Sequence, residues 1–269
     1  MITKKYATKI SAHTLRSQII KKIDSSIQIR RKDFLKKDWR RRIDILKSAK
    51  NSQEMFFYFN VCSRSDLKDL QKVIEAFKML IVVQFISFRT TYIWFKAMNA
   101  SLNLISKSVK NFKYLKRLEL SLKIFNELTD IGLYHFSKCL KRSVSLQKII
   151  LDFPNCWIIT DKGLARLSKS LRRLPLLQNV FFFFFHCSKI TDEGLQDLAQ
   201  SLGQLVCLQS VFLNFDYCYG ATDKGIPSLC ETIDKLACPQ KISMSFKNCT
   251  NITDRGGQKV NGACLGCPL

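Results

Sequence analysis

A spacing of 31 residues recurs through the second half of the chain and limits the folds that it can form. Thr-Asp pairs begin at this step, and a glycine follows two positions after each Asp; the pairs begin at Thr129, Thr160, Thr191, Thr222 and Thr253. A cysteine precedes four of them at the same step: Cys156, Cys187, Cys218 and Cys249. Because self-similarity at a fixed period of about 20–50 residues is typical of repeat proteins, the chain is predicted to be a tandem array.

Each unit holds one segment with helical periodicity and one with strand periodicity. Leucines spaced three or four apart follow each glycine and lie on one face of a helix, as do Leu164, Leu167, Leu171 and Leu174. Alternating apolar residues predict a short strand with one buried face, as in Ile149, Leu151 and Phe153. The Thr or Asp of each pair is suited to cap the helix by accepting a hydrogen bond from a free backbone N–H.

Two of the units, "LQKIILDFPNCWIITDKGL" and "LQSVFLNFDYCYGATDKGI", carry a family resemblance. They resemble leucine-rich repeats of the ribonuclease-inhibitor-like superfamily, and most closely the cysteine-containing type of F-box proteins, L-x-x-L-x-L-x-x-C…I-T-D-x-G-L. Here the cysteine falls two residues late, and the unit is longer than the usual length of about 26 residues. The expected fold is an α/β leucine-rich-repeat solenoid of about seven 31-residue units over residues 51–269. Its parallel strands would form the concave face and its helices the convex face.

Five consecutive phenylalanines, Phe181–Phe185, occupy one predicted strand and the start of its loop. Strand alternation directs Phe182 and Phe184 into the core, and Phe181 and Phe183 onto the concave face. An exposed row of large apolar side chains is typical of a contact site. The residues predicted to bind a partner there are Ile150, Phe181, Phe183, Phe212, Lys148 and Lys241. The alternative is that codon slippage produced the run and that the fold tolerates it.

The net charge of +23 is concentrated at the N-terminus, where residues 1–50 carry 16 basic and 4 acidic side chains. Apolar residues at helical spacing (Leu35, Trp39, Ile43 and Leu46) predict that this basic arm is an amphipathic helix that covers the first unit. The alternative role is nuclear import, or electrostatic binding of nucleic acid or of an acidic membrane surface. The basic residues concerned are Arg31, Lys32, Lys36, Lys37, Arg40, Arg41 and Arg42.

Motifs that suggest catalysis or metal binding have structural explanations in this array. Cys264 and Cys267 fall on helix core positions of the last unit, and the recurrent cysteines are predicted to form a buried ladder. The recurrent Asp residues are explained by helix capping. Eleven cysteines without an export signal indicate reduced thiols in the cytoplasm or nucleus. The sequence predicts no enzyme, no cofactor, no metal site and no small-molecule substrate.

The predicted function is a non-catalytic scaffold that binds a protein partner through the concave face, with Lys and Arg steering acidic partners. The resemblance to F-box proteins implies an alternative, a substrate-recognition subunit of a ubiquitin ligase. That alternative requires an adaptor-binding segment, and residues 1–50 contain no recognisable one. Electrostatic binding through the basic arm is the third hypothesis.

Overall fold

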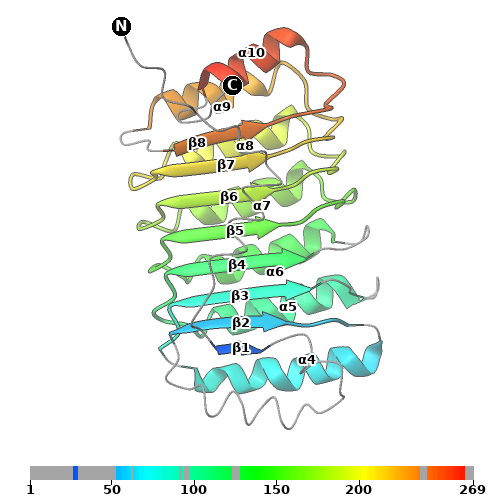
Figure 1. The fold of residues 1–269 in the computed structure, drawn as a ribbon, viewed down its shortest axis with the longest axis vertical. Helices are drawn as coiled ribbons and strands as arrows, with labels where there is room; N and C mark the ends of the chain where they lie inside the picture. Colours follow the sequence, from blue (N-terminus) through cyan, green and yellow to red (C-terminus); the bar gives the residue numbers. More distant parts are fainter. Residues whose placement is uncertain are drawn as a thin grey trace, which may run out of the picture.

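The computed structural model describes residues 27–29, 53–61, 63–80, 82–90, 93, 97–122, 128–236 and 241–263. Their strands form one parallel sheet in sequence order (Figure 1). The strands are β1 (Ile27–Ile29), β2 (Glu54–Tyr58), β3 (Phe85–Thr90), β4 (Arg117–Leu122), β5 (Lys148–Asp152), β6 (Asn179–Phe183), β7 (Ser210–Asn214) and β8 (Lys241–Ser245). The helices are α4 (Arg64–Ala76), with a 3-10 turn η1 (Phe77–Met79), α5 (Met98–Val109), α6 (Asp130–Leu140), α7 (Asp161–Leu171), α8 (Asp192–Leu202), α9 (Ile226–Asp234) and α10 (Asp254–Ala263).

Strands and helices alternate from β2 to α10, and the helices lie together on one side of the sheet (Figure 1). The protein is therefore an α/β leucine-rich-repeat solenoid with seven strand–helix units, as the sequence predicts. We keep the name concave face for the sheet face turned away from the helices. β1 lies inside the predicted basic arm and pairs with β2, so that Ile27 lies opposite Met55. The predicted arm helix lies outside the described residues.

The strand register reproduces the sequence spacing. Lys148 pairs with Asn179, Asn179 with Ser210, and Ser210 with Lys241, each 31 residues further along the chain. Because these three steps are the same, a residue at one position of β5 to β8 lies beside its equivalents in the neighbouring units. The prediction that alternate side chains of one strand face opposite sides of the sheet can therefore be checked position by position.

Inward-facing phenylalanines contact one another along the solenoid, edge to face or stacked. Phe182 and Phe184 are fully buried in the main core, as predicted. The ring of Phe184 lies 5.7 Å from that of Phe153 and 5.9 Å from that of Phe215, and Phe215 stacks on Phe246 at 5.7 Å. These four rings come from the extra Phe-x that delays each cysteine. The longer unit thus adds an aromatic ladder to the core, and aromatic pairs of this kind stabilise beyond simple area burial.

The recurrent Asp residues join neighbouring units. Asp130 accepts hydrogen bonds from the backbone N–H of Thr160 at 2.9 Å and from its hydroxyl at 2.7 Å. The same pair of bonds joins Asp161 to Thr191, Asp192 to Thr222, and Asp223 to Thr253. We call each of these Asp–Thr contacts an inter-unit link.

The threonines cap the helices, and the aspartates do not. The sequence left both residue types open as caps, and the prediction for Asp is wrong. The Thr160 hydroxyl accepts a hydrogen bond from the N–H of Lys162 at 3.2 Å and thereby caps α7. The recurrent glycine leaves room for the Asp of the preceding unit, because a Cβ at Gly225 would lie 2.6 Å from Asp192 Oδ1. Thr, Asp and Gly recur together because all three build the inter-unit link.

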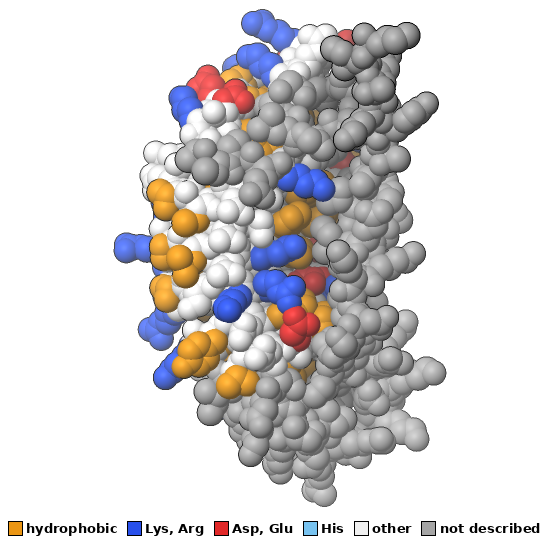
Figure 2. Space-filling model, turned by 60° about the vertical axis from the view of Figure 1, so that its left-hand side comes forward, with side chains coloured by type: hydrophobic (Ala, Val, Ile, Leu, Met, Phe, Trp, Pro, Cys, Tyr) orange, Lys and Arg blue, Asp and Glu red, His pale blue; other side chains and the backbone are white. Residues whose placement is uncertain are grey.

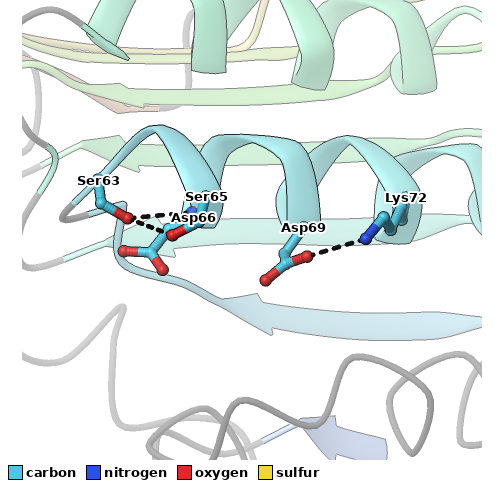
Figure 3. A network of polar contacts seen from close by, with 5 residues as sticks. All are labelled: Ser63, Ser65, Asp66, Asp69 and Lys72. Carbon is cyan, nitrogen blue, oxygen red and sulfur yellow. Dashed lines mark hydrogen bonds and ion pairs between the residues drawn. The ribbon is translucent and has the colours of Figure 1, made fainter.

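The helix of the first unit, α4, begins without a Thr-Asp pair and uses another cap. The Ser63 hydroxyl accepts a hydrogen bond from the N–H of Asp66 at 3.2 Å at the start of α4 (Figure 3). Ser63 and Ser65 share a further hydrogen bond of 2.7 Å, and Lys72 pairs with Asp69 at 3.2 Å one turn further along. A serine cap with an acidic first turn satisfies the free N–H groups of this helix start.

The recurrent cysteines are buried, as predicted. Cys218 and Cys249 donate to the carbonyl oxygens of Phe184 and Phe215 at 3.1 and 3.2 Å, so each thiol contacts the preceding unit. Burial raises the pKa of the Cys187 and Cys218 thiols well above the usual range and raises the pKa of Cys249 to about 11. Thiolate, the reactive form, is therefore scarce at neutral pH.

Iodoacetamide at about pH 8 is expected to leave Cys187, Cys218 and Cys249 unmodified in the native protein, because thiolate formation requires a higher pH. Cys207, which is only half-buried, should react before these three. Peptide mass spectrometry before and after denaturation in urea measures the order. Rapid native labelling of Cys218 would contradict the buried ladder.

Candidate protein-binding site

Four apolar side chains meet on the concave face over β5, β6 and β7. Ile150, Phe181 and Phe212 pair in register across the three strands, and Phe183 follows Phe181 on the same face. They form a cluster of their own, separate from the main core. We call Ile150, Phe181, Phe183 and Phe212 the aromatic cluster. The predicted row and the predicted direction of its side chains are both present.

The aromatic cluster is more buried than the sequence predicts. Phe183 is 4% exposed, Phe212 5% and Ile150 8%, and only Phe181 is partly exposed. The rings contribute to their own cover, since Phe212 lies 5.0 Å from Phe183 and stacks on Phe181 at 6.3 Å. Parallel strands hold equivalent side chains about 4.8 Å apart, so large neighbouring rings shield one another. Phe181 is the aromatic side chain of this cluster that a partner can reach.

Lys148 lies against the cluster, with its Nζ 4.7 Å from the centre of the Phe181 ring. Burial lowers the pKa of this ammonium group, and the charge of Arg117 adds to the effect while Glu119 opposes it. Lys241 is exposed and occupies the same strand position in β8. Asn179 of β6 and Ser210 of β7 occupy this strand position between the two lysines. The structure therefore brings Lys148, but not Lys241, to the aromatic cluster.

Polar side chains continue the concave face towards the N-terminal strands. Arg89 and Glu119, both largely buried, form an ion pair of 2.5 Å, and Ser121 donates to Asp152 at 2.8 Å. Burial raises the pKa of Glu119, although the Arg89 charge opposes this. Sequence reasoning missed Arg89. Its alignment with Ser121, opposite which it lies in the sheet, would have placed it on this face.

A second set of aromatic residues lies where the strands end. His186 and Tyr217 each precede a ladder cysteine, adopt left-handed backbone angles (φ of 58° and 60°), and stack at 4.2 Å. Non-glycine residues in this region carry backbone strain. The equivalent Asn155 and Asn248 have the same conformation. Sequence reasoning did not single out this pair, although the 31-residue step from His186 to Tyr217 was the signal that could have found it.

The described residues contain no candidate metal site and no candidate membrane-spanning helix, and they do not include the predicted residues of the basic arm. Among the described residues, no group of three or more His, Cys, Asp or Glu side chains could hold a metal ion. Within the same part of the chain, no helix has the length and hydropathy that a bilayer crossing requires. The predicted arm residues lie outside the described part and remain a prediction: Arg31, Lys32, Lys36, Lys37, Arg40, Arg41 and Arg42.

Comparisons with known proteins add little to this geometry. No model of a known protein family matches the sequence, and no curated protein sequence matches it. The C-terminal domain of tropomodulin from Caenorhabditis elegans is similar at a TM-score of 0.43 and 16% identity, over 62% of this chain and 92% of that chain. A solved complex of yeast Rad7 and Elc1 is similar at a TM-score of 0.38 and 12% identity, over 84% of this chain and 64% of the matched chain. The fold assignment rests on the strand register of this protein.

Proposed function

We propose that the protein is a non-catalytic scaffold that binds a protein partner through the concave face, centred on Phe181. The observation that supports this is an aromatic cluster on the sheet face opposite the helices, separate from the main core, with Lys148 beside it. An accessible aromatic ring that packs on buried apolar side chains is typical of an interface hot spot.

The neighbouring charges favour an acidic partner. Lys148 has part of its hydration removed before any partner arrives, because it is already half-buried over Phe181. A carboxylate from a partner would pair with this ammonium group in a poorly solvated place, where charge pairs are stronger than at an open surface. Parallel pairing holds the strands in register and the inter-unit links join the helix starts behind them, so the platform is ordered before binding.

Replacing Phe181 by Ser is expected to weaken binding of such a partner about tenfold or more, because hot-spot aromatic residues carry most of the binding free energy. The full chain is used to capture partners, and each purified partner is then titrated calorimetrically against wild type and Phe181→Ser.

The matched control is Ile131→Ser, which removes an exposed apolar side chain of α6. Lys148→Gln should weaken an acidic partner more at low salt than at high salt. Equal affinity of a captured partner for wild type, Phe181→Ser and Ile131→Ser would refute the proposed site.

The two other hypotheses predict different results in the same experiment. A ubiquitin-ligase adaptor recovered equally with wild type and Phe181→Ser would favour the substrate-recognition subunit. Binding that disappears in moderate salt and depends on Arg40, Arg41 and Arg42 would favour electrostatic binding through the basic arm.

A further inference from the structure

Four turns that lead from a helix to the next strand expose apolar side chains at one edge of the solenoid. Val206 is 81% exposed, and Tyr114, Val144 and Leu176 are each about half exposed. They occur in four consecutive units, directly before β7, β4, β5 and β6. Scattered surface hydrophobic residues need no explanation, but recurrence at the same turn of successive units is not scatter. We call these four turns the turn edge.

Basic residues accompany the apolar tips, and acidic residues are missing from the same segments. Residues 110–117, 141–148, 172–179 and 203–210 contain no Asp or Glu. The first three segments hold exposed basic side chains at Lys113, Lys116, Lys141, Arg142 and Arg173. Cations near helix C-termini also stabilise the helix, which explains Lys141 and Arg142. The helix dipole does not explain the exposed tips.

Equivalent turns of a solenoid form a row, so the tips can contact one surface at the same time. All strands of the sheet begin on the left in Figure 1, and the turn edge lies on that side. Figure 2, in which this side comes forward, shows hydrophobic side chains following one another along the molecule with Lys and Arg beside them. The arrangement is a line of separate apolar tips, with cations beside the first three.

We propose that the turn edge docks on a membrane surface that contains anionic lipid. The tips of Tyr114, Val144, Leu176 and Val206 enter the headgroup region, while Lys113, Lys141 and Arg142 bind lipid phosphate and carboxylate groups. Basic residues beside exposed apolar residues are the composition of interfacial membrane-binding surfaces. A nucleic acid would use the cations but leave the aliphatic tips exposed to water.

The test is co-sedimentation of the full chain with vesicles of phosphatidylcholine alone and of phosphatidylcholine mixed with phosphatidylserine. Wild type is expected to bind the mixed vesicles. The variant Lys113→Gln/Lys141→Gln/Arg142→Gln should lose about fivefold in partitioning for each cation removed. Val144→Ser/Val206→Ser should bind more weakly even at low salt, since it keeps every charge.

Two matched controls make the test specific. Lys162→Gln/Lys189→Gln/Lys224→Gln removes the same charge from the opposite edge, where these exposed lysines precede or begin the helices, and should bind as wild type. Arg40→Gln/Arg41→Gln/Arg42→Gln changes the basic arm and should retain most of the binding. Equal binding to both kinds of vesicle, unchanged binding of both turn-edge variants, or loss of binding only in the arm variant would overturn the proposal. So would a turn-edge variant that loses affinity for a duplex oligonucleotide while vesicle binding is unchanged.

Discussion

Replacing Phe184 by Ala is expected to lower the free energy of unfolding by about 3–5 kcal/mol. The ring is fully buried and contacts Phe153, Phe182 and Phe215. Its removal leaves a cavity in the aromatic ladder, and neighbouring backbone fixed by strand pairing cannot close it. Urea denaturation followed by far-ultraviolet circular dichroism measures the change.

Phe181 supplies the matched control within the same run of five. Phe181→Ala removes a ring that is partly exposed on the concave face, and it should cost about 1 kcal/mol. A difference of this size between two phenylalanines three positions apart would show that the run serves two faces of one strand. Similar losses for Phe181→Ala and Phe184→Ala would contradict the described alternation.

Removing one inter-unit link has the second large expected effect. Asp161→Ala should lower the free energy of unfolding by about 3 kcal/mol or more, because hydrogen bonds to charged groups contribute about 1.5–3 kcal/mol each. Asp161 accepts two such bonds from Thr191, at 2.8 and 2.6 Å. Asp254→Ala is the control: it occupies the same place in α10, and among the described residues no threonine of a following unit bonds to it.

A glycine substitution tests the same link from its other side. Gly194→Ala would place a Cβ against Asp161 Oδ1 and should destabilise the protein on its own. In the double variant Asp161→Ala/Gly194→Ala this clash is absent. Its loss of stability should therefore be smaller than the sum of the two single losses, as expected for residues in contact. Strict additivity would mean that the two positions do not interact.

Acid is expected to weaken the last of these links. The hydrogen bond from the Thr253 hydroxyl holds the pKa of the Asp223 carboxyl below its usual value. A lowered pKa in the folded state stabilises the protein above the pKa of the unfolded chain. This contribution is present at neutral pH and disappears as the pH falls through the lowered pKa.

Periodicity alone was sufficient to predict which side chains face the core. Strand alternation within the 31-residue repeat predicts that Phe182 and Phe184 face the core. The strand register and the burial of both rings confirm this prediction. The buried cysteine ladder followed from the same spacing. Local rules suffice here because a strand has a side-chain period of two, so one correct strand position orients all the others.

Partners from other units were harder to predict. An Asp beside a helix start fits a helix cap on local grounds, whereas the donor that binds Asp161 comes from Thr191 in the next unit. The pairing of Arg89 with Glu119 likewise depends on two strands meeting. Phe212 contacts rings of the neighbouring strand, and such contacts could not be predicted from its own strand.

The inter-unit links have a consequence for how such a gene can change. From α6 to α9, each unit presents Thr and Gly to the unit before it and Asp to the unit after it. Duplication or deletion of one whole 31-residue segment therefore leaves every acceptor facing a donor, wherever the break falls. Unequal recombination among these units can therefore lengthen or shorten the molecule without creating an unmatched junction.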